Sequence, residues 1–155
     1  MALARKNPAL KAAVFDSASV CEIARQNIAQ AGLADRLDAV PGDCFLDPFP
    51  SGADAILFCH FFTIWSPERN QALLAKAYQA LAPGGVVLIF NMMQDDDRCG
   101  PLTAAMGSPY FLTLATGEGM LYTWSEYEQW IRAAGFRRVV RRELIRHHGV
   151  VMGIK

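Results

Sequence analysis

Residues 53–67 read ADAILFCHFFTIWSP, and this stretch sets the architecture of the chain. Residues 53–59 form an apolar run, the pattern of a strand that helices cover on both faces. Ser66 and Pro67 then supply the N-cap and the first-turn proline of a helix. A buried strand that leads into a capped helix indicates a parallel sheet with helices packed on it.

The same alternation occurs upstream of this stretch. Lys11–Asp16 is predicted to be a strand, and the helix after it is expected to begin with a capping box of Ser19 and Glu22. The predicted helix ends at Gly32, and a second strand is expected over residues 36–40. The apolar face of this helix is predicted to carry Val20, Ile23, Ala24, Ile28 and Ala31.

Downstream, the helix that opens at Ser66 is expected to end at Pro83-Gly84-Gly85, before a strand over residues 86–90. Its apolar stripe comprises Leu73, Leu74, Ala77 and Leu81. Strands and helices that alternate at this spacing predict βαβ units.

The last third of the chain has a different pattern. Leu102–Ala115 is expected to be a helix broken at Pro109, and Thr123 with Glu126 forms the capping box of another helix. Strands over residues 136–145 and 150–155 then predict an antiparallel hairpin at the sheet edge. The expected fold is therefore α/β, a Rossmann-like, mostly parallel sheet with helices on both faces and a C-terminal hairpin.

Length and composition exclude several classes of protein. The 155 residues suit one domain, and 52% hydrophobic with 19% charged residues excludes a disordered chain. No apolar run reaches the roughly 18 residues of a membrane span, and the N-terminus lacks a signal-peptide core, so a cytoplasmic protein without membrane contact is expected. The basic residues of 132–155 alternate with valines, which favours a solvated strand edge over nucleic-acid binding.

Ligands of doubly wound sheets bind beyond the carboxyl ends of the strands. The residues at these positions are Asp16, Asp43-Cys44, Cys59-His60 and Asn91-Met92. A carboxylate such as that of Asp16 can accept two hydrogen bonds from a ribose diol, although it can equally cap the next helix. No spacing of His60, His147 and His148 matches a known metal site, and none is predicted.

Six segments in this order resemble the class I S-adenosylmethionine-dependent methyltransferases, and most closely the O-methyltransferase family that acts on small aromatic and polyketide-like molecules. They are AVFDSASVCEIARQNI, PGDCFLDPFP, GADAILFCHFF with IWSPE, LAPGGVVLIF, QDDD and TWSEYEQWIRAAGF. The resemblance covers nearly the whole chain. It implies that S-adenosylmethionine is the cofactor.

Residue by residue, the resemblance implies that Asp16 holds the cofactor ribose and that Asp43 and Cys44 flank the adenine. It places Cys59 near the methionine end of the cofactor and Trp65 close to the adenine. The alternatives are a turn-stabilising role for Asp43 and core packing for the two cysteines and the tryptophan.

The chain departs from the family in lacking the glycine-rich loop that precedes Asp16. In the family, the central strand, that loop and an N-terminal dimerisation domain would lie upstream of Met1. Residues 1–155 are therefore expected to be a single, N-terminally truncated catalytic domain. Two strands would then have unpaired edges, which an intertwined partner would have to fill.

The catalytic pair of the family also differs. Its His-Asp base falls at Thr63-Ile64, neither of which can accept a proton, and its supporting glutamates fall at Asn91 and Leu121. No catalytic residue is assigned. His60 is the one candidate for proton transfer, with a packed core histidine as the alternative.

The expected function is methyl transfer to a small-molecule acceptor, at oxygen or an acidic carbon, with alignment in place of a protein base. The acceptor pocket is expected to include Asn91, Met92, Met106, Tyr110 and Phe111, although helical spacing equally makes the last three core residues. A homodimer or pairing with another chain is expected. The alternative function is a non-catalytic methyltransferase fragment or partner subunit.

Overall fold

The computed structural model describes all residues, 1–155, and they form two compact units. The first unit comprises Met1–Pro50 and the second comprises Ser51–Lys155.

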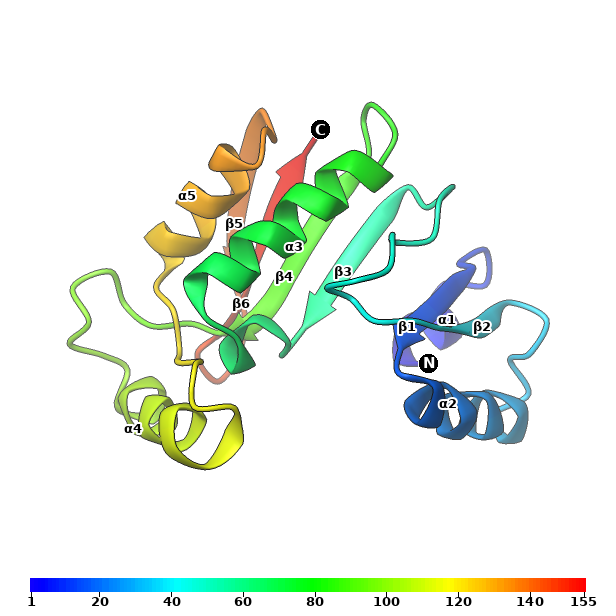
Figure 1. The fold of residues 1–155 in the computed structure, drawn as a ribbon, viewed down its shortest axis with the longest axis horizontal. Helices are drawn as coiled ribbons and strands as arrows, with labels where there is room; N and C mark the ends of the chain where they lie inside the picture. Colours follow the sequence, from blue (N-terminus) through cyan, green and yellow to red (C-terminus); the bar gives the residue numbers. More distant parts are fainter. The chain divides into compact units, whose positions relative to one another are not determined.

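The first unit is a short parallel sheet with one helix connecting its strands (Figure 1). Strand β1 (Ala12–Asp16) pairs with β2 (Leu37–Pro41) in parallel, and α2 (Ala18–Gln30) links them. A short helix, α1 (Ala2–Lys6), precedes β1. The unit has a small core made of Ala4, Ile28, Leu33 and Leu37.

Helix α2 confirms its predicted end but not its predicted start. It stops before Gly32, which has a left-handed φ of 66°, and Leu33 N–H bonds back to the Ile28 carbonyl. The predicted capping box at Ser19 is wrong, because the helix already begins at Ala18 with Ser17 as its N-cap and without a side-chain cap bond. Ser19 therefore lies inside the first turn.

The predicted apolar face of α2 is only partly confirmed. Ile28 is buried, but Val20 and Ile23 are exposed, and Cys21 is buried in their place. The helix turns Cys21 and Ile28 inward, and the Cys21 thiol lies 3.3 Å from the Asp16 carbonyl oxygen that accepts its hydrogen bond.

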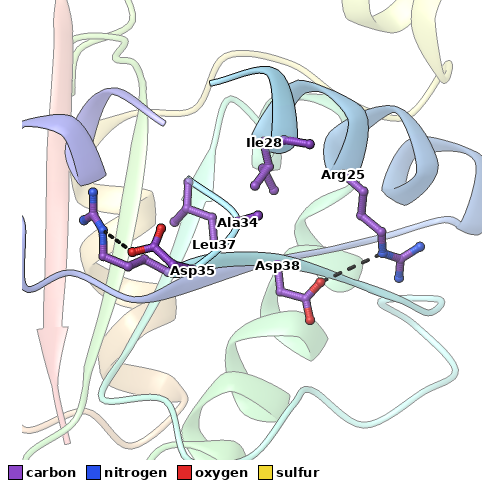
Figure 2. A pocket seen from close by; sticks show the side chains of 8 residues that line it. Arg25, Ile28, Ala34, Asp35, Leu37 and Asp38 are labelled. Atoms are coloured by element: carbon purple, nitrogen blue, oxygen red, sulfur yellow. Dashed lines mark ion pairs between the residues drawn. The ribbon is translucent and has the colours of Figure 1, made fainter. Parts of the chain in front are cut away.

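A hollow of about 550 Å³ lies on the surface of the first unit (Figure 2). Its charged side chains form ion pairs, Arg25 with Asp38 at 3.9 Å and Arg36 with Asp35 at 3.7 Å. The Arg36 guanidinium also donates to carbonyl oxygens of the α1 region, including that of Ala4 at 3.0 Å. This arginine therefore holds the N-terminal segment against the sheet.

The second unit contains a four-stranded sheet in the order β3-β4-β6-β5 (Figure 1). Strands β3 (Ala55–Cys59) and β4 (Val86–Met92) are parallel, whereas β6 (His148–Ile154) is antiparallel to both β4 and β5 (Arg138–Glu143). The predicted hairpin is confirmed, with β5 as the edge strand. The fold is the predicted α/β type.

Helices α3 (Pro67–Ala80) and α5 (Trp124–Ala133) pack side by side on one face of this sheet (Figure 1). The Ser66 hydroxyl accepts from Arg69 N–H at the start of α3, and the predicted stripe of α3 is buried. The capping box of Thr123 and Glu126 is confirmed by both of its hydrogen bonds. Side chains of β4 alternate between a buried face, which includes Asn91, and a half-buried one.

The break predicted at Pro109 takes the form of a change in helix type just after it. Helix α4 (Leu102–Tyr110) includes Pro109 and continues into a wider π-helical turn, η2 (Phe111–Ala115). Proline lacks an N–H, and the helix widens directly after it instead of ending.

Four strands, β1, β2, β3 and β5, have an edge without a strand partner. β1 pairs only with β2, and β3, at the end of its sheet, pairs only with β4. Val14 of β1 and Leu57 of β3 are both exposed. None of the helices has the length and apolar character required to cross a membrane.

Candidate active site

Three predicted cofactor residues, Asp16, Asp43 and Cys44, lie at the carboxyl end of the first unit's sheet. Asp16 ends β1, and its carbonyl oxygen accepts from Gly42 N–H, just after β2, at 2.9 Å. The Asp16 carboxylate is exposed and accepts from Ser17 N–H at 2.7 Å through Oδ1. Its Oδ2 makes no hydrogen bond within the protein, so it is open to a ligand hydroxyl.

Asp43 stabilises its own turn, the alternative role considered for it. Its Oδ1 accepts from Phe45 N–H at 2.7 Å, and its N–H donates to Asp47 Oδ2 at 2.8 Å. Cys44, next in this turn, is half-buried. The turn brings Asp43 and Cys44 to the same end of the sheet as Asp16.

Cys59 and His60 follow β3 in the second unit. Cys59 is exposed, and partial burial still raises the pKa of its thiol, which keeps it protonated at neutral pH. His60 has a left-handed φ of 50°, and its N–H donates to the Phe90 carbonyl at 2.8 Å. Burial and the neighbouring His148 lower the pKa of His60, so its imidazole is neutral at pH 7.

The segment expected at the position of the family's base pair is buried at Thr63 and half-buried at Ile64. A 3₁₀ turn, η1 (Phe62–Ile64), contains Thr63, which is buried. A side chain at Gly119 would meet the backbone of Thr63 and Ile64, and the Thr116 hydroxyl donates to the Ile64 carbonyl. Neither position offers a titratable group.

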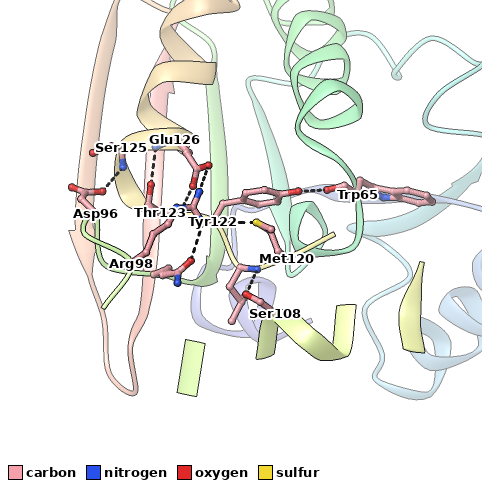
Figure 3. Close-up of polar contacts among 11 residues, drawn as sticks. Trp65, Asp96, Arg98, Ser108, Met120, Tyr122, Thr123, Ser125 and Glu126 are labelled. Carbon is pink, nitrogen blue, oxygen red and sulfur yellow. Dashed lines mark hydrogen bonds and ion pairs between the residues drawn. The ribbon is translucent and has the colours of Figure 1, made fainter. Parts of the chain in front are cut away.

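Trp65 is held through its backbone (Figure 3). Its carbonyl oxygen accepts from the Tyr122 hydroxyl at 2.6 Å and from the Asn70 amide at 3.1 Å. The Arg69 guanidinium lies 5.2 Å from the centroid of the indole. Burial is the main cause that raises the pKa of Tyr122 to about 12, which keeps its hydroxyl protonated as a donor.

Asn91 and Met92, both predicted to contact the acceptor, face opposite sides of the sheet. Asn91 is fully buried and donates to the Tyr127 hydroxyl of α5 at 2.9 Å. Met92 is half-buried on the other face, in register with His148 of β6. The structure therefore does not bring these two side chains together.

The remaining acceptor candidates lie on α4 and η2. Met106 and Tyr110 are exposed, which excludes the core role considered for them, and the Tyr110 and Phe111 rings are 5.2 Å apart. Leu102 and Leu114 are also exposed, so large apolar side chains recur at every fourth position from Leu102 to Leu114.

Sequence reasoning missed the contact between His60 and His148. Their ring centroids are 5.1 Å apart, and Phe90 stacks on His148 at 5.4 Å. Only the hairpin register could have placed His148 there, and no local motif signals it. No group of three metal-ligating side chains is arranged to hold an ion.

A second missed feature joins the acidic loop to α5 (Figure 3). Arg98 pairs with Glu126 at 2.6 Å, and the Asp96 carboxylate accepts from Ser125 N–H at 2.7 Å. Arg141 of β5 pairs with Asp96 at 3.5 Å. The network fixes the loop to the first turn of α5.

Known proteins resemble both the sequence and the fold. A family model described as an O-methyltransferase domain matches residues 1–137. The L-tyrosine C(3)-methyltransferase of Streptomyces lavendulae is 45% identical over 136 residues, which are 88% of this chain and 37% of that protein. The 3-hydroxy-5-methyl-1-naphthoate 3-O-methyltransferase of Streptomyces sahachiroi is 40% identical over 155 residues, or 99% of this chain and 44% of that protein.

The fold matches a solved methyltransferase. The apo crystal structure of the S-adenosylmethionine-dependent methyltransferase SibL superposes with a TM-score of 0.92 and 46% identity, over 99% of this chain and 46% of that one. The chain thus spans less than half the length of these relatives.

Proposed function

The chain belongs to the O-methyltransferase domain family, and from that premise we propose that it forms part of an S-adenosylmethionine-dependent enzyme that methylates a small-molecule acceptor. The observation that carries this proposal is the exposed Asp16 carboxylate at the carboxyl end of β1, with one oxygen free of internal hydrogen bonds.

The residues at this end of the first unit fit the cofactor. The free oxygen of Asp16 can accept from a ribose hydroxyl, as carboxylates at the ends of such strands do. The Oδ1 of Asp43 accepts a hydrogen bond within its own turn, so Asp43 is proposed to shape the loop beside the adenine. Cys44 adds a half-buried side chain to the same loop.

In the second unit, Cys59 and Trp65 are each proposed to contact the cofactor. The Cys59 thiol stays protonated, so it serves as a packing surface and does not compete as a nucleophile. Tyr122 and Asn70 fix the backbone of Trp65, which orients its indole. When bound, S-adenosylmethionine supplies an electrophilic methyl group.

The acceptor is proposed to be an aromatic compound that ionises without the family's His-Asp base. Thr63 and Ile64 hold no proton acceptor, so an acceptor that is already anionic, such as a phenolate or the conjugate base of an acidic carbon, suits the site. Two similar proteins are named for methylation of a tyrosine carbon and of a hydroxynaphthoate oxygen, which supports an aromatic acceptor. Met92, Met106, Tyr110 and Phe111 are proposed to contact it, and Asn91 to shape the site from beneath the sheet.

Calorimetric titration of the chain with S-adenosylhomocysteine tests this function. Saturable heat is expected, and it should be absent with L-homocysteine, which lacks the ribose and the adenine. The absence of heat up to millimolar S-adenosylhomocysteine would contradict the proposal and favour a second candidate function, described next.

That candidate is a non-catalytic subunit or fragment that pairs with another polypeptide segment. The free edges of β1 and β3 support it, because unpaired N–H and C=O groups of an edge strand accept a further strand. We also propose that residues 1–155 act as one catalytic domain whose open edges are filled in this way, in a homodimer or with another chain. A monomeric mass in light scattering at micromolar concentration would argue against such pairing.

A further inference from the structure

The strongest unexplained feature is a ring cluster at the carboxyl end of β3 and β4. The His60 ring meets Phe90 edge-on at 4.9 Å and His148 edge-on at 5.1 Å. Phe90 and His148 stack at 5.4 Å with an interplanar angle of 20°. Nothing in the proposed cofactor contacts uses His148 or Phe90.

A surface hollow of about 670 Å³ adjoins this cluster. The turn between β5 and β6 forms its wall, and its lining residues are Phe90, Glu143, Leu144, Ile145, Arg146 and His148. Arg146 and His147 have left-handed φ angles of 57° and 60°. Backbone strain of this kind persists where surrounding contacts enforce it, and it is common at ligand sites.

Hydrogen bonds fix the turn. Met93 N–H donates to the His147 carbonyl at 2.9 Å, and Leu144 N–H donates to the His148 carbonyl at 2.8 Å. His148 Nδ1 lies 2.9 Å from the Arg146 carbonyl oxygen, which can only accept, so Nδ1 is the donor of this hydrogen bond. Its Nε2 is left to meet a ligand.

The lining combines apolar side chains, a positive charge and a carboxylate. Leu144 and Ile145 are exposed apolar side chains, and together with Phe90 they favour an aromatic ring. Arg146 brings a permanent positive charge and planar donors that suit a carboxylate. Glu143 brings an acceptor for a ligand hydroxyl.

We propose that this hollow, which we call the hairpin hollow, binds a hydroxylated aromatic carboxylate, with the ring against Phe90 and His148 and the carboxylate on Arg146. The assignment rests on the proposed function in that this ligand is the methyl acceptor. His60 lies edge-on to both Phe90 and His148 and so places a neutral imidazole beside the proposed position of the ligand ring. Met92, itself a predicted acceptor residue, pairs with His148 in the register of β4 and β6.

NMR titration with 3-hydroxy-2-naphthoate tests the proposal, with imidazole signals of the three histidines as the readout. The His60 and His148 signals should shift saturably, whereas that of His147, which makes no ring contact to the cluster, should not. The neutral methyl ester of the probe should bind about tenfold more weakly or worse, because it cannot form the charge-assisted bond to Arg146.

Arg146→Gln should weaken binding of the probe by about tenfold or more. The matched control is Arg138→Gln, which changes an arginine at the opposite end of the same hairpin, in register with Ile154. Equal affinities of the two variants, or equal shifts of all three histidines, would overturn the proposal. The circular dichroism of each variant verifies that it remains folded.

S-adenosylhomocysteine titrated into the same samples separates the two proposals. If S-adenosylhomocysteine binds and the naphthoate does not, the hairpin hollow is not an acceptor site, and the proposed function stands. Naphthoate binding without that of S-adenosylhomocysteine supports the hollow as a site and contradicts the proposed cofactor.

Discussion

Asn91 on β4 donates its side-chain amide to the hydroxyl oxygen of Tyr127 on α5 across 2.9 Å, and both side chains are fully buried. Burial raises the pKa of the Tyr127 hydroxyl well above its usual value. The carbonyl oxygen of the Asn91 amide has no hydrogen-bond partner. The bond to Tyr127 is therefore the only hydrogen bond of the buried Asn91 side chain, and it connects α5 to the sheet.

Tyr127→Phe should lower the free energy of unfolding by about 1 to 3 kcal/mol, because it leaves the Asn91 amide N–H groups unpaired in the core. Urea denaturation measures the loss. The double variant Asn91→Leu with Tyr127→Phe is the control, since it removes both partners. It should be less destabilised than the two single variants together, and strict additivity would show that the residues are not coupled.

Asp16→Ala should weaken S-adenosylhomocysteine binding by about tenfold or more, because an unpaired ribose hydroxyl costs about 1 to 3 kcal/mol. Calorimetry measures the change. Asp38→Ala, at the other end of the same two-stranded sheet, is the control and should bind normally. If both variants bind as the parent does, Asp16 does not hold the ribose.

Asp96 should contribute a pH-dependent share of stability. Partial burial pushes its pKa upward, but hydrogen bonds from Ser125 and the nearby Arg141 outweigh it and lower the pKa below its usual value. A lowered folded-state pKa stabilises the protein above the unfolded value of about 3.9, and the contribution is lost as the pH falls through the folded-state value.

Asp96→Asn should therefore destabilise the protein by about 0.5 kcal/mol at pH 7, a value reduced for solvent screening, and by less at pH 2.5. Urea unfolding at the two pH values provides the test. Arg141→Gln should reproduce part of the effect at pH 7. A loss of equal size at both pH values would contradict the assignment.

Met106→Gln should change the free energy of unfolding by no more than about 0.5 kcal/mol, because the side chain is 69% exposed. If Met106 contacts the acceptor, the same change raises KM for the acceptor in the whole enzyme while kcat stays near the parent value. Ala104→Gln serves as the contrast, since Ala104 is fully buried on the same helix and its replacement should unfold α4. A destabilised Met106→Gln would show that this face of α4 is packed.

Much of the fold was predictable because local signals and burial agree. The apolar run at 53–59, the Ser66-Pro67 start of α3 and the capping box at Thr123 each depend on neighbours within a few residues. The capping box at Ser19 failed for the same reason, because any Ser followed three residues later by Glu fits the pattern. The helix instead begins directly behind β1, where Ser17 N–H bonds to the Asp16 carboxylate.

The site was less predictable, because its contacts join distant parts of the chain. Asp16 could be named from its place after a strand. Which face of β4 carries Asn91 and which carries Met92 depends on where α5 packs. The contact of His60 with His148 depends on hairpin register and on a left-handed backbone at His60, which no nearby residue in the sequence indicates.

The strand order of the second unit constrains how it folds. β6 follows β5 in the chain, yet it lies between β5 and β4. β5 and β6 can pair locally through their short turn, but until β6 is inserted beside β4, β3 and β4 form only a two-stranded sheet with one another. The β4–β6 pairing joins residues far apart in the sequence, so it closes a long loop and is slow to form. Folding intermediates of this unit should therefore contain the β5–β6 hairpin undocked from β4, and the four-stranded sheet should form in one late step.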